Sequence, residues 1–296
     1  MDERRSDGPV LVAVEDPEHV QQLVRTAGDL ARFGSGSVRI VTVVAKPHDS
    51  PFGIFDDDTI RREFGGDSRQ LIERASVPEG VTVERDVIVD RSVARGLLAA
   101  VAESDPAALV VGWRERSGTD AVLGTTVDTL VERAACDLYV ERVGREADGV
   151  DSVLLPVAGG SHVGVAARVV AAIAARNDAR VVVLSVTTAD VGRDEAAAFV
   201  AEGRDAVETA VDAGAAVGAV ETTVREAADA TAGIVDAAAD HDVVVLGATR
   251  RGALRRRLVG SVAQRIVDRT DRTVILGWDG ETVGGPLGRL GALLRR

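Results

Sequence analysis

Short apolar runs of strand length alternate with longer segments of helical periodicity along most of the chain. In the first half this pattern predicts strands at 10–14, 38–44, 82–88, 108–112 and 137–142, and helices at 17–33, 59–75, 92–103 and 126–134. Regular alternation of this kind favours a parallel sheet with crossover helices. Asp16 is placed to cap the first helix, and Pro17 suits its first position.

The second half repeats the pattern, with strands expected at 152–157, 180–187, 218–225, 242–247 and 272–278, and helices at 161–176, 193–213, 228–240 and 262–269. The run at 10–15 returns at 153–158, and Gly124-Thr125 returns as Gly260-Ser261, which indicates a tandem duplication. We therefore expect domains at 1–145 and 150–279, followed by a tail at 280–296. Each domain is predicted to be α/β, a doubly wound, Rossmann-like parallel sheet of five strands.

In doubly wound sheets, ligands bind beyond the carboxyl ends of the strands. The most informative such segment is 247–262, where Gly247 ends a buried run and Gly260-Ser261 opens a helix. Between them lie five arginines, at 250, 251, 255, 256 and 257. Glycine lets a ligand approach the backbone, and free N–H groups at a helix start favour an anion. From chemistry alone, a phosphate site and a solvated loop whose serine merely caps a helix both remain open.

The composition of the chain excludes several classes of protein and of binding partner. A hydrophobic content of 46% excludes a disordered chain, and the formal net charge of -12 disfavours binding to nucleic acid. Cys136 is the single cysteine, which excludes an intramolecular disulfide and a cysteine-rich zinc site. The sequence contains neither an apolar run long enough to span a membrane nor an apolar signal segment, so we expect a cytoplasmic protein.

Candidate catalytic groups are few. His19 and His162 occupy equivalent places at the start of the first helix of each half, as ligand contacts or as solvated residues. The acidic run at 56–58 lacks the spacing of a calcium loop and is expected to be a solvated loop. No nucleophile has an evident base, so we predict neither an enzyme nor a metal site.

These features resemble universal stress protein (UspA-like) domains in tandem, from about Pro9 to Trp278, with the adenine nucleotide alpha hydrolase-like fold. The ATP-binding members of that family carry Gly-x2-Gly-x9-Gly-(Ser/Thr) after the fourth strand. The resemblance implies a site for ATP or another adenine nucleotide in the second half, formed by Pro156, Val157, Ala158, Gly247, Arg250, Gly260, Ser261 and Val262. Arg250 replaces the second glycine of the pattern, and Ala158 replaces an acidic residue that contacts the base.

By the same resemblance, the first half carries a degenerate site at Val14, Glu15, Gly112, Gly124 and Thr125. Glu115 stands where the second glycine is expected, and Gly124 arrives one residue early. Because a carboxylate beside phosphates is repulsive, we expect this half to bind ATP poorly or not at all.

The resemblance also implies that segments 137–142 and 273–278 pair, which would make the chain an intramolecular pseudo-dimer. The expected function is a non-catalytic stress-response protein that binds a nucleotide in its second half. Two alternatives are a ligand-free regulatory or scaffold module, such as a partner of a membrane transporter, and a weak ATP hydrolase or phosphotransferase. The leucines and arginines of the tail suit either a docking segment or a frayed end.

Overall fold

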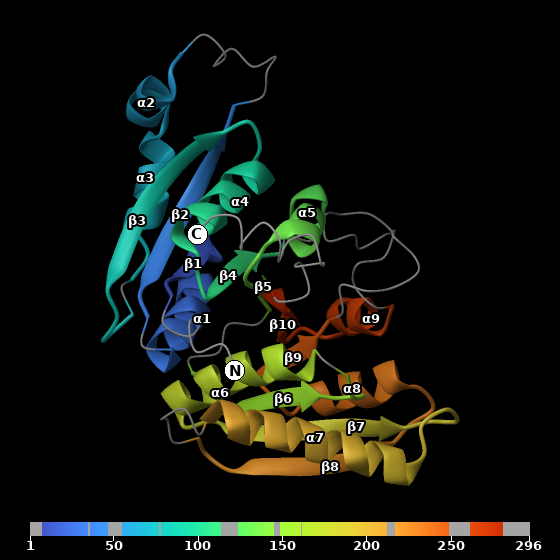
Figure 1. Cartoon of the computed structure of the whole chain (residues 1–296). Helices are drawn as coiled ribbons and strands as arrows, with labels where there is room; N and C mark the ends of the chain where they lie inside the picture. Colours follow the sequence, from blue (N-terminus) through green and yellow to red (C-terminus); the bar gives the residue numbers. More distant parts are fainter. Residues whose placement is uncertain are drawn as a thin grey trace, which may run out of the picture. The chain divides into compact units, whose positions relative to one another are not determined.

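The chain forms two compact units in a computed structural model (Figure 1). Unit 1 comprises residues 1–111, 124–138 and 279–296, and unit 2 comprises 112–123 and 139–278. The structure describes residues 8–34, 36–46, 55–76, 78–113, 124–144, 149–160, 162–211, 217–248 and 261–280, with Phe64 and Ser261 described by their backbone alone.

Unit 1 contains four parallel strands in the order β3-β2-β1-β4: β1 (Val10–Ala13), β2 (Val38–Ala45), β3 (Val83–Asp90) and β4 (Ala108–Gly112). Its helices are α1 (Val20–Phe33), α2 (Asp57–Thr59), a π-helix (Ile60–Phe64), α3 (Gly66–Glu73), α4 (Val93–Ser104) and α5 (Thr125–Arg133). The central strands β1 and β4 are short, almost wholly buried apolar runs, as parallel sheets covered on both faces require, whereas Val87 is the one buried residue of β3.

Unit 2 contains five parallel strands in the order β10-β9-β6-β7-β8: β6 (Ser152–Pro156), β7 (Arg180–Thr187), β8 (Val220–Glu226), β9 (Val243–Gly247) and β10 (Thr273–Trp278). Its helices are α6 (Val163–Asn177), α7 (Arg193–Val211), α8 (Ala230–Ala238) and α9 (Ser261–Arg269). The predicted α/β fold with doubly wound parallel sheets is confirmed.

Strand β5 (Asp137–Arg142) ends the first repeat, but its residues 139–142 belong to unit 2, where the strand is the neighbour of β10. The pairing predicted for 137–142 with 273–278 is therefore present. Tyr139 is fully buried, and its hydroxyl donates a hydrogen bond to the Val165 carbonyl of α6 at 3.1 Å.

Helices cover both faces of the sheet in unit 2. On β7, Val183 faces Gly203 of α7, whereas Val182 and Leu184 face Ala237 of α8. Successive side chains of a strand point to opposite faces, so α7 and α8 lie on opposite sides. In Figure 1, α7 runs along β7 and β8.

The start of the first helix differs from the prediction. We expected Asp16 as its cap and Pro17 as its first residue, but α1 begins at Val20. The Asp16 side chain accepts a hydrogen bond from the backbone N–H of Glu18 at 3.0 Å, and its carbonyl accepts one from His19 at 3.2 Å. These bonds form a turn that takes the place of the first helical residues.

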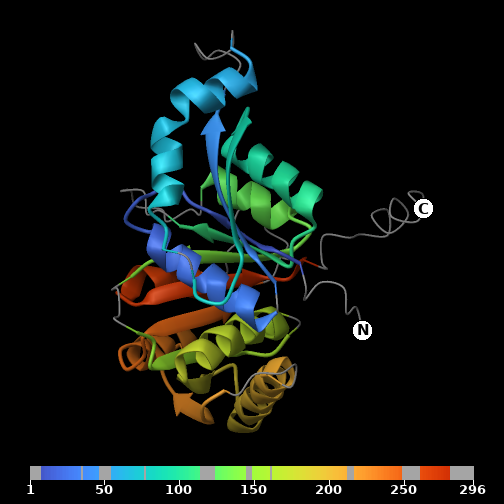
Figure 2. The ribbon, with the colours of Figure 1, turned by 90° about the vertical axis from the view of Figure 1, so that its left-hand side faces the viewer.

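The single helix expected at 59–75 is divided. The chain passes from α2 into the π-helix and then, after Gly65, into α3, so that Figure 2 shows a bent helical segment at one end of unit 1. A side chain at Gly65 would place Cβ 2.5 Å from the carbonyl oxygen of Arg61, which explains the glycine at the break.

The acidic run at 56–58 is ordered by local bonds. Asp56 caps α2 by accepting the N–H of Thr59 at 2.8 Å, which lowers the pKa of Asp56, and Asp58 pairs with Arg61 at 2.6 Å. Asp57 lies 3.3 Å from Nζ of Lys46, the only lysine of the chain, and Nζ also donates to the carbonyl of Phe55. Each carboxylate thus has a structural partner.

Candidate functional site

The end of strand β6 lies at the carboxyl edge of unit 2. Pro156 is its last residue, and the N–H of Val157 donates to the carbonyl of Leu184 on β7 at 2.8 Å. Val157 is buried, while Ala158 is exposed and brings no charge to the strand end. These three predicted residues therefore form a largely apolar backbone edge.

A glycine turn leads from this edge into α6. Gly159 and Gly160 have φ angles of +71° and +103°, a region that residues with a Cβ rarely occupy. His162 follows at the N-cap position of α6, without a side-chain capping bond. Its Nδ1 is buried and has no hydrogen-bond partner among the described residues. The half-buried imidazole thus places an unpaired polar atom beside the glycine turn.

Gly247 at the end of β9 touches the start of the same helix. A Cβ at this position would lie 2.4 Å from the carbonyl oxygen of His162 and 2.8 Å from its Cδ2. Glycine is therefore required here by the approach of α6. The N–H of Ala248 donates to the carbonyl of Gly277 on β10 at 2.8 Å, which holds the end of β9 against β10. The structure thus brings Pro156, Val157 and Gly247 together around the α6 start.

Helix α9 begins at Ser261, one residue before the expected start at 262, with Val262 in its first turn. That first turn carries no acidic residue. Free N–H groups at such a helix start attract an anion, and no carboxylate of the turn opposes it. Arg250 and Gly260 lie outside the described residues.

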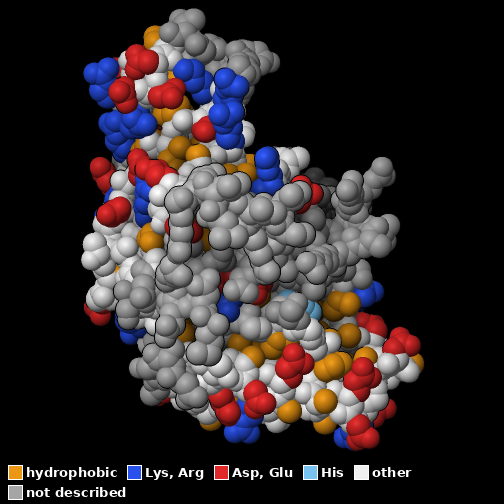
Figure 3. All heavy atoms as spheres, viewed as in Figure 1, with side chains coloured by type: hydrophobic (Ala, Val, Ile, Leu, Met, Phe, Trp, Pro, Cys, Tyr) orange, Lys and Arg blue, Asp and Glu red, His pale blue; other side chains and the backbone are white. Residues whose placement is uncertain are grey.

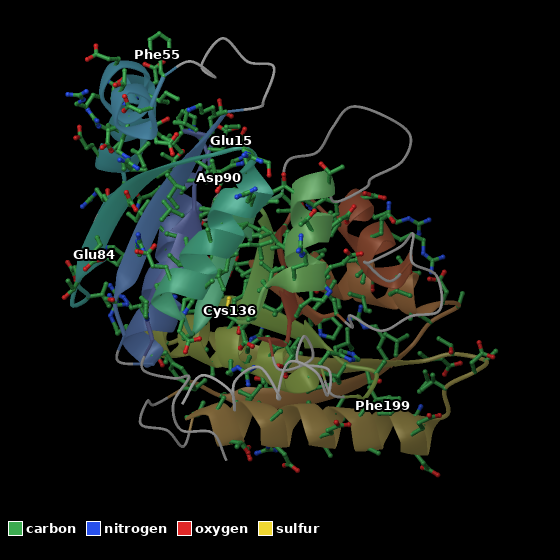
Figure 4. All side chains as sticks on the ribbon, turned by 45° about the horizontal axis from the view of Figure 1, so that its top comes forward. Glu15, Phe55, Glu84, Asp90, Cys136 and Phe199 are labelled. Atoms are coloured by element: carbon green, nitrogen blue, oxygen red, sulfur yellow. The ribbon has the colours of Figure 1, made fainter. Side chains whose placement is uncertain are left out.

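The equivalent positions of unit 1 lie at the ends of β1 and β4 and at the start of α5. Val14 is buried, with its N–H bonded to Val41 at 2.9 Å, whereas Glu15 is exposed. Figure 4 shows Glu15 and Asp90, from the carboxyl ends of β1 and β3, at the same end of unit 1. Gly112 ends β4, and Gly124, with φ +84°, precedes Thr125 at the start of α5.

Asp128 in the first turn of α5 is a difference that sequence comparison of the glycines alone misses. Burial, with a smaller contribution from Glu132, raises the pKa of Asp128. The matching position of α9, three residues after its first residue, is Gln264. A carboxyl group in the first turn of α5 competes with an anionic ligand for the helix start. In the sequence, the difference between Asp128 and the equivalent Gln264 could have revealed that the two helix starts differ in charge.

Phe199 and Glu202 of α7 are also absent from the predicted site. A Cβ on Gly159 would lie 2.7 Å from Cε1 of Phe199 and 3.6 Å from Oε2 of Glu202. Both side chains therefore border the turn after β6. Nothing in the spacing of 193–213 distinguishes them from other positions of an amphipathic helix.

We expect the imidazole of His162 to titrate below its ordinary range, because burial lowers its pKa while the Glu202 carboxylate partly opposes that shift. Glu202→Gln should lower the pKa of His162 further, whereas Glu208→Gln, on the same helix, should leave it unchanged. NMR titration of the four histidines checks both statements. An unchanged titration in Glu202→Gln would contradict the contact.

Over the described ranges, no cluster of three or more His, Cys, Asp or Glu side chains is arranged to hold a metal ion. Within the same part of the chain, no helix is both long and apolar enough to cross a membrane. The face of unit 2 in Figure 3 carries many acidic side chains over α7. The strand-end turn beneath this helix is built instead from glycine and apolar residues.

Comparison with known proteins identifies relatives. A family model described as the universal stress protein family matches residues 8–142 and 149–276. A universal stress protein from Archaeoglobus fulgidus DSM 4304 is 14% identical, with a TM-score of 0.60, and the match covers 92% of this chain and 98% of that one. No curated protein sequence matches the chain.

Two further solved structures are similar. A functionally unknown protein from Pseudomonas aeruginosa PAO1 is 16% identical, with a TM-score of 0.59, covering 97% of this chain and 98% of that one. A universal stress protein from Archaeoglobus fulgidus in complex with dAMP is 19% identical over 45% of this chain and 96% of that one, with a TM-score of 0.33.

Proposed function

Because the chain belongs to the universal stress protein family, we propose that it is a non-catalytic regulatory protein that binds an adenine nucleotide at the carboxyl edge of unit 2. The phosphates would lie against the N–H groups that open α9, and the base would lie toward the end of β6. The expected residues are those predicted from the sequence: Pro156, Val157, Ala158, Gly247, Arg250, Gly260, Ser261 and Val262.

The observation that carries this proposal is the difference between the two equivalent helix starts. Asp128 occupies the first turn of α5, whereas the first turn of α9 has no acidic residue and follows an arginine-rich loop. An anion is therefore favoured at the second site and disfavoured at the first. For the helix alone, a carboxylate in the first turn is stabilising, so its replacement by Gln264 in α9 gives up that stabilisation and leaves the helix start open to an anionic ligand.

Calorimetric titration with ATP, AMP and cyclic AMP tests the proposal. One nucleotide per chain is expected, and Gly260→Val should weaken binding at least about 10-fold, because a side chain there blocks the approach of a phosphate to the backbone. Adenine nucleotides are chosen for this titration because the Archaeoglobus fulgidus relative was solved in complex with dAMP.

Gly124→Val is the matched control, since it alters the equivalent position of unit 1 and should leave binding unchanged. Circular dichroism establishes that both variants are folded. Absence of binding heat at millimolar nucleotide would reject the proposal. It would favour the ligand-free regulatory or scaffold module, which the loss of a carboxylate at Ala158 also supports.

A further inference from the structure

Helix α7 is held unusually close to the turn that follows β6. A Cβ on Gly203 of this helix would lie 2.7 Å from Val183 and 3.0 Å from Val157. On the other side of the contact, Gly159 leaves room for the ring of Phe199. A Cβ on Gly159 would lie 2.7 Å from Cε1 of that ring. Glycines on both elements thus fix α7 against the strand end, so its side chains there have defined positions.

Phe199 and Glu202 lie on the same face of α7, because residues three apart in a helix are neighbours. The ring of Phe199 is partly exposed beside the turn, and the helix carries it on the side of unit 2 shown in Figure 4. Glu202 is exposed, with Oε2 3.6 Å from the position that a Cβ of Gly159 would take. An aromatic ring and a carboxylate therefore flank the same turn.

Glu202 supplies the negative charge that the strand end itself lacks, since Ala158 carries none. Among the described residues, its carboxylate forms no ion pair or hydrogen bond, and it acts on His162 through space. A carboxylate accepts hydrogen bonds and repels other acceptors. An aromatic ring provides a flat apolar surface on which a base stacks favourably.

Resting on the proposed function, we infer that α7 reads the base of the nucleotide. Phe199 provides the stacking surface, and Glu202 accepts a hydrogen bond from an exocyclic amino group of a purine. The second unit therefore selects 6-aminopurine over 6-oxopurine nucleotides, because a carbonyl oxygen facing Glu202 is repelled. The residues that recognise the base lie on α7, the second helix of the unit. The Glu202 carboxylate takes the place of the acidic residue that is absent at Ala158.

The test compares AMP with IMP, in which a carbonyl replaces the 6-amino group and N1 carries a hydrogen. In titrations of the full chain, AMP is expected to bind about 10-fold or more tightly than IMP, the usual effect of a hydrogen bond to a charged group. Glu202→Gln should weaken AMP binding and leave IMP equal or tighter, which brings the ratio close to one. Phe199→Leu should weaken both nucleotides together.

Glu208→Gln is the control, because it removes the same charge from the same helix at a residue paired with Arg204 and should keep the AMP preference. Equal binding of AMP and IMP to the wild-type chain, or an unchanged preference in Glu202→Gln, would overturn the inference. In either case, loss of both nucleotides in Gly260→Val would still support the proposed function. Absence of binding to either nucleotide would overturn both.

Discussion

Replacing Trp278 with alanine is expected to lower the free energy of unfolding by about 3–5 kcal/mol, the typical cost of deleting a large aromatic side chain from a core. Trp278 ends β10 and is fully buried. The cost combines the lost transfer of the ring from water with the cavity that its neighbours only partly fill. Chemical denaturation followed by circular dichroism measures it.

Trp278→Phe is the matched variant. The indole Nε1 of Trp278 is buried and has no hydrogen-bond partner among the described residues, so phenylalanine removes an unpaired donor along with part of the ring. We therefore expect a clearly smaller loss than with alanine. Equal losses for the two variants would show that the indole N–H makes a strong bond.

Gly247→Ala is expected to lower both the free energy of unfolding and the affinity for nucleotide. The added methyl group would meet the backbone carbonyl of His162, which has no flexible side-chain end to move aside. The first turn of α6 must then shift, at a cost of about 1–3 kcal/mol, as in other overpacked cores. Because this turn borders the proposed site, nucleotide affinity should fall as well.

Gly164→Ala provides the comparison for this variant. Gly164 is the second residue of α6, and a Cβ there would meet no atom within 4 Å. Alanine should therefore be neutral or slightly stabilising in this helix. If Gly247→Ala were as stable as Gly164→Ala and bound nucleotide normally, the close approach of α6 to β9 would not be a constraint.

The central strands were predictable because they are largely buried apolar runs between turn residues, and the expected boundaries of β4 and β5 match the structure. The start of α1 could not be predicted, because Asp16 can cap a helix or close a turn before it. In the structure, its side chain accepts the N–H of Glu18 and closes a turn. The division at Gly65 likewise depends on a π-turn that periodicity does not reveal.

For the candidate site, the strand ends and the start of α9 follow from motif and topology. The contributions of Phe199 and Glu202 could not be predicted, because they depend on how closely α7 approaches a turn about 40 residues earlier in the chain. The place of Gly247 at a strand end follows from the motif, but its contact with His162 depends on how closely α6 approaches β9.

Duplication within one polypeptide has a genetic consequence. In an assembly of two identical chains, any substitution appears at both helix starts, whereas here Asp128 and Gln264 vary independently. Duplication thus allows one copy to change its helix start while the other stays as it is, and a single gene encodes an asymmetric pair. Exchanging these two side chains, Asp128→Gln with Gln264→Asp, would show whether that asymmetry is reversible.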